Sequence, residues 1–231
     1  MTAASPPALR DRLGIVGQLA DARITVLQKG YLNDEGAAVA TLARLRTAAG
    51  KDALAIPQLW GLVDTAPLYE KPEDSDARPL REHELQWAEQ AFHTALGLWA
   101  VHQQSRRTGM HQGTRAPSGQ LGAAVRRLMP THEITEPVHK RFVRAGTAPN
   151  WPRLGQRLRD LVVLLRQHDV PLDYGLLAEQ LYTWQQPGGP HTVRAAWGRS
   201  FHAYRPADPA GAETGTTSDT TRSSDTDKDA S

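Results

Sequence analysis

Residues 154–165 read LGQRLRDLVVLL, and this stretch decides the fold class. Its apolar residues recur at the spacing that places them on one face of an α-helix: Leu154, Leu158, Leu161, Val162 and Leu165. Arg159 and Arg166 lie on one flank of that face, Arg153 and Arg157 lie on the other, and Pro171 follows as a stop signal. The stretch therefore predicts an amphipathic helix with one side in a hydrophobic core.

The segments on both sides show the same helical period, and none shows sustained period-2 alternation. Helices are expected over about 7–30, 33–49, 85–102, 172–186 and 191–204, and in two further segments that Ser118 and Thr135 would cap. Gly50 is expected at a positive φ after the second helix. The sequence thus predicts an all-α fold, a bundle of about eight helices with a smaller N-terminal part (about 1–66) and a C-terminal bundle (about 80–206).

The composition excludes several classes of protein. With 231 residues, 39% of them hydrophobic, the chain can bury a core without disulfides. Cysteine is absent, which excludes disulfides, thiolate metal sites and a cysteine nucleophile. The longest aliphatic run, residues 161–165, is far too short for a membrane span. We expect a soluble, cytoplasmic protein with no membrane partner.

The net charge is unevenly distributed along the chain. Residues 207–231 are rich in Thr, Ser, Asp, Gly and Ala, without a large apolar side chain, and this composition predicts a disordered acidic tail. The whole chain carries a formal +2 and this tail carries −4, so residues 1–206 carry +6. The tail is either an acidic competitor for a basic surface or a solubilising extension. The excess positive charge is compatible with a polyanionic partner.

Motifs for catalysis and cofactor binding are absent from the sequence. There is no glycine-rich phosphate loop, no pair of histidines one helical turn apart with an adjacent Glu, and no Gly-x-Ser-x-Gly elbow. The sequence therefore predicts no enzyme, no cofactor and no metal site. A carboxylate site around Glu82 and Glu84 is the weaker, enzymatic alternative.

Basic side chains flank the apolar stripes of at least four predicted helices. Lys140, Arg141 and Arg144 are expected to share the outer arc of the helix that buries Val138 and Phe142, with no acid among them. Further basic residues accompany other stripes: Arg44, Arg46, Lys51, Arg126, Arg127, Arg153, Arg157, Arg159, Arg166, Arg194 and Arg199.

Two interpretations apply to these basic residues. An arginine binds phosphate through its planar, permanently charged fork. Alternatively, arginine stems cover apolar surface and their heads pair with nearby acids. For the set as a whole we favour a nucleic-acid surface. Since no base-reading motif is present, binding is expected to be directed at the backbone and to weaken with salt.

The ordered series of segments resembles one protein family. The segments are TLARLRTAAGK (41–51), IPQLWGLV (56–63), ALGLWAVHQQ (95–104), LGAAVRRL (121–128), KRF (140–142), LRDLVVLLR (158–166), VPLDY (170–174) and WGRSF (197–201). Over residues 24–204 they are similar to the CasB family, the small subunit of the type I-E CRISPR surveillance complex Cascade. Thr47, Asp160, Ala123 and Ala124 depart from the family's basic pattern.

The resemblance implies a non-enzymatic, all-α antiviral subunit that is present as a pair inside Cascade. Its partners would be the backbone and large subunits, the crRNA, and the target DNA with its displaced strand in the R-loop. It also implies that phosphate contacts come from Arg46, Arg144, Arg159 and Arg194, followed by Arg126, Arg127, Lys140 and Arg141. The alternative function is a free-standing helical DNA-binding regulator.

Overall fold

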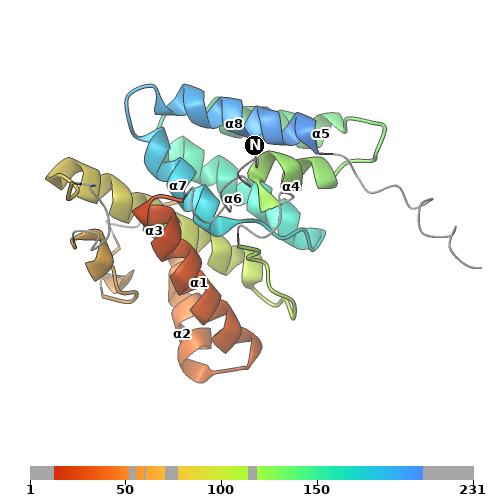
Figure 1. Ribbon diagram of the computed structural model, residues 1–231. Coiled ribbons are helices and arrows are strands. Elements are labelled where there is room, and N and C mark those ends of the chain that lie inside the picture. The colour runs from red at the N-terminus through yellow and green to blue at the C-terminus, as the bar shows by residue number, and fades with distance from the viewer. Residues whose placement is uncertain (1–12, 52–55, 60, 71–77, 114–118, 205–231) are drawn as a thin grey trace, which may run out of the picture.

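The computed structural model describes residues 13–51, 56–59, 61–70, 78–113 and 119–204, and over these residues it is all-α (Figure 1). The predicted fold class is confirmed. The α-helices are α1 (Ile15–Leu32), α2 (Gly36–Leu45), α3 (Glu82–Gln103), α4 (Leu121–Arg127), α5 (Glu136–Gly146), α6 (Trp151–Gln167), α7 (Tyr174–Trp184) and α8 (Gly189–Ala203). Three 3₁₀ turns accompany them: η2 (Arg46–Ala48), η3 (Pro57–Leu59) and η4 (Ala66–Leu68).

Helix α3 lies at the centre of the bundle. Its apolar residues form a stripe in the sequence, yet every residue from 91 to 103 is buried. The reason is that α1, α6 and α7 all pack against α3, so its C-terminal half has no side facing solvent. Small residues such as Ala95, Gly97 and Ala100 allow this close packing.

The first two helices differ in length from their predictions. Helix α1 begins at Ile15, after an N-cap at Gly14, and not at residue 7; residues 7–12 lie outside the described part. Helix α2 begins at Gly36, and not at residue 33, because Asp34 adopts a φ of 55° that ends the helical path. Gly50 has a φ of 79°, as predicted.

Later helix starts agree with the sequence in part. Thr135 is the N-cap residue of α5, although its side chain makes no capping hydrogen bond. Helix α4 has Gln120 as its N-cap, and Ser118, the predicted one, lies outside the described residues. The side chain of Asp173 caps α7 by accepting a hydrogen bond from the backbone N–H of Leu176 at 2.8 Å. The predicted acidic tail, 207–231, also lies outside the described residues.

The N-terminal helix is joined directly to the C-terminal bundle. The carboxylate of Glu179 on α7 accepts a hydrogen bond from the backbone N–H of Gly17 at 3.0 Å. A Cβ on Gly17 would lie only 2.9 Å from the backbone oxygen of Gly175, so α1 and α7 cross closely. These contacts span the predicted division at residues 66–80, which stays a prediction. No helix among the described residues is both long and apolar enough to cross a membrane.

Candidate nucleic-acid interface

The C-terminal end of α5 carries the densest group of linked basic residues. Arg144 is exposed in the last turn of α5, and the Arg157 guanidinium on α6 donates a hydrogen bond to the main-chain carbonyl of Arg144. The last carbonyls of a helix lack partners within the helix and carry partial negative charge. The Arg157 side chain therefore satisfies one of these carbonyls and brings a second positive charge to the end of α5.

Helix α8 adds a third cation to this end. A Cβ on Gly146 would lie 3.6 Å from Cγ of Arg194, so the stem of Arg194 passes over the last residue of α5. The head of Arg194 is exposed. Arg141, three residues before Arg144, is also exposed, and its guanidinium makes a long hydrogen bond of 3.4 Å to the Pro137 carbonyl. We call these residues the α5 basic cluster: Arg141, Arg144, Arg157 and Arg194.

Lys140 is engaged with an acid, which corrects the predicted acid-free arc. Its Nζ lies 2.6 Å from a carboxylate oxygen of Glu136, one helical turn earlier. The Lys140 side chain is 70% exposed and that of Glu136 is 72% exposed, so water screens the pair. The charge of Lys140 is thus partly offset on the surface of α5, and we leave it outside the α5 basic cluster.

A second basic group surrounds η2. Arg44, Thr47, Lys51 and Ile56 line an open depression of about 720 Å³. A Cβ on Gly50 would lie 3.2 Å from Cδ of Arg159, so the stem of this α6 arginine packs over the residue that ends the turn. Arg46 is half-buried within η2 itself. The η2 basic group is therefore Arg44, Arg46, Lys51 and Arg159.

The remaining two predicted residues lie at the end of α4, where one of them has a structural role. The Arg126 guanidinium donates hydrogen bonds to the main-chain carbonyls of Pro130 at 2.7 Å and Thr131 at 2.6 Å. These bonds close the turn after α4. Arg127 is half-buried, and its Nη1 has no hydrogen-bond partner among the described residues. Among the described residues, the side-chain bonds of Arg126 go to this turn and not to either basic group.

Helix α6 contributes one arginine to each of the two basic groups. Arg157 lies on the flank of α6 that faces α5, and Arg159 lies on the flank that faces η2. The sequence places these residues on opposite flanks, and the structure confirms it. Arg157 is not among the eight residues predicted to contact phosphate; its flank position was the only signal, since its carbonyl partner depends on how α5 and α6 cross.

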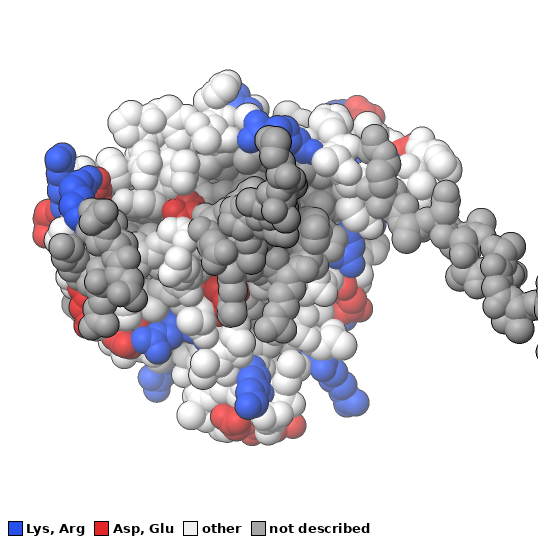
Figure 2. Space-filling view, in the orientation of Figure 1, with Lys and Arg blue, Asp and Glu red and all other residues white. Residues whose placement is uncertain are grey.

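On one face of the molecule, the described charged residues do not form a single positive stripe (Figure 2). On the face that Figure 2 shows, Lys and Arg side chains stand in separate groups, with Asp and Glu side chains among them. Separate groups of cations suit a flexible, extended polyanion, which can touch several points along its backbone. They suit a compact anion less well.

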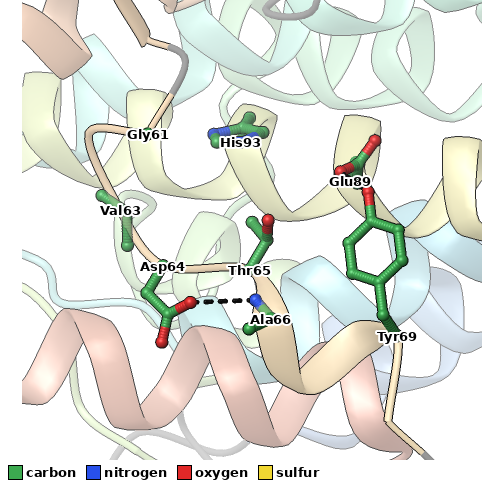
Figure 3. Close-up of a pocket in the computed structure, with 8 residues that line it drawn as sticks. All are labelled: Gly61, Val63, Asp64, Thr65, Ala66, Tyr69, Glu89 and His93. Atoms are coloured by element: carbon green, nitrogen blue, oxygen red, sulfur yellow. Dashed lines mark hydrogen bonds between the residues drawn. The ribbon is translucent and has the colours of Figure 1, made fainter.

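Another depression with titratable side chains lies between η4 and α3 (Figure 3). Its acids are already engaged: Tyr69 donates a hydrogen bond to Glu89, and Asp64 accepts one from the backbone N–H of Ala66 at 2.9 Å. The bond to Glu89 raises the pKa of Tyr69 to about 12. Burial lowers the pKa of His93. Among the described residues, no group of three or more His, Asp and Glu side chains is arranged to hold a metal ion.

Glu84, one of the two carboxylates of the enzymatic alternative, also has structural partners. Glu84 accepts two hydrogen bonds from the Arg78 guanidinium, both at 2.6 Å, and one from the backbone N–H of Arg81 at 2.8 Å. These contacts hold the pKa of Glu84 at about 2. Glu84 therefore closes the N-terminus of α3.

Comparison with known proteins identifies one family and two similar solved structures. A family model described as CRISPR-associated protein Cse2 matches residues 41–202. The crystal structure of CasB from Thermobifida fusca is 51% identical in sequence, covers 83% of this chain and 99% of its own, and superposes with a TM-score of 0.72. A chain of a structure described as a CRISPR RNA-guided surveillance complex has the same fold, at 20% identity, with coverage of 81% and 93% and a TM-score of 0.58. No curated protein matches significantly.

The family match includes α2 to α8, apart from the first residues of α2 and the last residue of α8, and all residues of both basic groups. It spans well over half of the chain, and the similarity to the Thermobifida fusca protein extends over almost the whole of that protein. The chain therefore belongs to the CRISPR-associated Cse2 family, which is also known as CasB.

Proposed function

We propose that the chain is the non-catalytic small subunit of a type I-E CRISPR Cascade effector, and that it holds nucleic-acid backbone to stabilise the crRNA-guided R-loop. The observation that carries the proposal is the family match over residues 41–202, because this range contains every residue of the two basic groups. In such an effector the chain would work beside the backbone and large subunits, the crRNA, the target DNA and a second copy of itself.

The chemistry of the basic groups supports a role in holding phosphates. Arg144, Arg159 and Arg194 are exposed and come from three different helices, so their forks can reach phosphates spaced along a strand. Base pairing nearly balances when a guide RNA displaces one DNA strand. A few contacts to the backbone are therefore enough to favour the open state. Arg46, in the same basic group as Arg159, would extend the same path.

The remaining predicted residues contribute less in this proposal. Arg126 is committed to the turn after α4 and Lys140 is paired with Glu136. A phosphate would have to displace these partners before either cation could bind it in full. We rank both residues, with the half-buried Arg127, below the exposed arginines.

The test is a native affinity purification of the tagged chain from its own cells. Bound proteins are identified by mass spectrometry and bound RNA is sequenced. We expect a stoichiometric assembly that holds about two copies of the chain and one short, repeat-flanked RNA. A chain that purifies alone, or only with promoter-like duplex DNA, would refute the proposal and favour a free-standing regulator.

A matched control separates assembly from nucleic-acid binding. The variant Arg144→Glu/Arg159→Glu changes two exposed side chains and leaves the buried core intact. It should enter the assembly with the same stoichiometry as the unchanged chain. If the variant is excluded from the assembly, these residues serve subunit contact and the role proposed for them is wrong.

A further inference from the structure

We propose that the acidic segment 207–231 docks on the α5 basic cluster and is displaced by nucleic acid. The segment would act as an internal polyanion that lowers the affinity of the free chain for nucleic acid. This inference rests on the proposed function, because it assigns a regulator to the surface proposed to hold phosphate. The segment lies beyond residue 202, where the family match ends.

The point at which the described chain ends places the segment next to α5. The Phe201 ring near the end of α8 stacks on Phe142 of α5, with ring centroids 5.2 Å apart and planes at 17°. It also lies 5.8 Å from the ring of His139. Since α8 ends at Ala203, the chain leaves the bundle beside the middle of α5 (Figure 1).

Helices α5 and α8 run in opposite directions, and this arrangement determines how far the end of α8 lies from the α5 basic cluster. Phe201, near the end of α8, meets the middle of α5, whereas Arg194, earlier in α8, meets Gly146 at the end of α5. His139 and Arg144 are five residues apart on α5, or about 7.5 Å along the helix axis. The α5 basic cluster is therefore a short distance from where the segment departs.

The length of the segment is ample for this distance. Asp219 is 15 residues beyond Tyr204, and a polypeptide of 15 residues can reach over at most roughly 50 Å. Two sites joined by a short tether meet at an effective concentration on the order of millimolar. Even weak ion pairs would then be populated without a second molecule.

The charges of the two surfaces are complementary. The α5 basic cluster carries four arginines, and the segment carries a formal −4 from six acids and two bases. The acids are Asp208, Glu213, Asp219, Asp225, Asp227 and Asp229. The nearest acid within the described helix, Glu136, is paired with Lys140, so the helix itself neutralises only that cation. Exposed ion pairs are weak and screened by salt, which makes the docking reversible.

A direct test detects docking of the segment in the absence of nucleic acid. The chain has no cysteine, so Ser224→Cys accepts a single nitroxide label in the full-length protein. At 50 mM salt we expect paramagnetic broadening of backbone amides 140–146 and 191–198, and none in the α1–α2 hairpin. Broadening should vanish at 0.5 M salt and in the variant Arg144→Glu/Arg194→Glu. Absence of broadening, or equal broadening over the whole surface, would overturn the proposal.

A second measurement tests whether the acidic segment lowers the affinity for nucleic acid. Replacing the six acids by Asn or Gln keeps the length of the segment, and we expect the full chain to bind a 30-nucleotide single strand about three- to tenfold more tightly at 50 mM salt. The difference should disappear at 0.5 M salt. Equal affinities would overturn the regulation and leave the proposed function standing. Docking without any binding of nucleic acid would refute the proposed function of the cluster and, with it, the regulation.

Discussion

The guanidinium of Arg157 on α6 donates a hydrogen bond to the main-chain carbonyl of Arg144 at the end of α5. This bond joins the two helices that carry most of the α5 basic cluster. It also places a positive charge where the α5 dipole is negative, so the charge stabilises the helix end before any ligand binds. Arg157 therefore positions Arg144, and its replacement has a structural effect that can be measured separately.

We expect Arg157→Ala to lower the free energy of unfolding by about 1–2 kcal/mol, because the variant lacks both the hydrogen bond from a charged donor and the favourable interaction with the helix dipole. Urea unfolding at pH 7 measures the change. Arg153→Ala is the control on the same helix, since Arg153 is exposed and its side chain hydrogen-bonds at 3.3 Å to Gln156 of α6 itself. It should change stability by less than about 0.5 kcal/mol. Equal effects of the two substitutions would show that the bond to α5 is not stabilising.

The crossing of α4 and α8 depends on one glycine. A Cβ on Gly122 would lie 2.0 Å from the Trp197 backbone oxygen and 2.6 Å from the Phe201 nitrogen. Gly122→Ala should therefore force the helices apart and cost about 3 kcal/mol or more. Gly198→Ala is the matched control, because a Cβ there meets nothing within 4 Å. It should be neutral or stabilise by up to about 1 kcal/mol. Thermal unfolding of both variants checks the pair, and similar melting temperatures would contradict this packing.

Gly50 links backbone conformation to the η2 basic group. With a φ of 79° and Arg159 packed over it, Gly50→Ala is expected to cost about 1–2 kcal/mol. Gly36→Ala, in open space at the start of α2, should not destabilise the chain. Chemical denaturation distinguishes them. If Gly50→Ala unfolds at the same denaturant concentration as the unchanged chain, the turn that supports Arg159 does not require a glycine.

His102 makes the stability of the fold depend on pH. Burial beside Arg106 and Arg166 lowers the pKa of His102 from 6.5 to about 3. Between these values the unfolded chain binds the proton and the folded chain does not, so stability falls as the pH falls through this window. The slope from this group is at most about 1.4 kcal/mol per pH unit.

The contribution of His102 is isolated by a variant that does not titrate. His102→Gln can still hydrogen-bond to the Tyr174 hydroxyl, which lies 2.9 Å from His102 Nδ1. Comparing urea unfolding at pH 7 and pH 5, we expect the unchanged chain to lose more stability than the variant. The same loss in both would mean that His102 is protonated alike in the folded and unfolded chains.

Side-chain periodicity was sufficient to predict the helices that face the core, whereas the basic side chains needed the structure. Val138, Phe142 and Ala145 are buried as the period of α5 indicates. The pair of Glu136 with Lys140 was also readable, since i,i+4 spacing places the two side chains together. The hydrogen bonds of Arg126 to the turn after α4 could not be predicted from the sequence, because they depend on the path of a non-helical segment. The bond from Arg157 to α5 depends on helix crossing, which no local pattern encodes.

The most direct test of the proposed phosphate-binding role is the salt dependence of target-DNA binding by the complete complex. The complex would carry either the unchanged chain or Arg144→Glu/Arg159→Glu, one residue from each basic group. Lys29→Glu/Arg107→Glu is the control of equal charge change, since both cations are exposed and outside the two groups. The slope of log affinity against log salt falls by about 0.7–0.9 for each phosphate that the protein no longer neutralises. We expect the slope to be smaller by about 1.4–1.8 in the Arg144→Glu/Arg159→Glu complex, with a shorter R-loop lifetime, and unchanged in the control. The same slope and R-loop lifetime in all three complexes would contradict the assignment of these arginines to the nucleic-acid backbone.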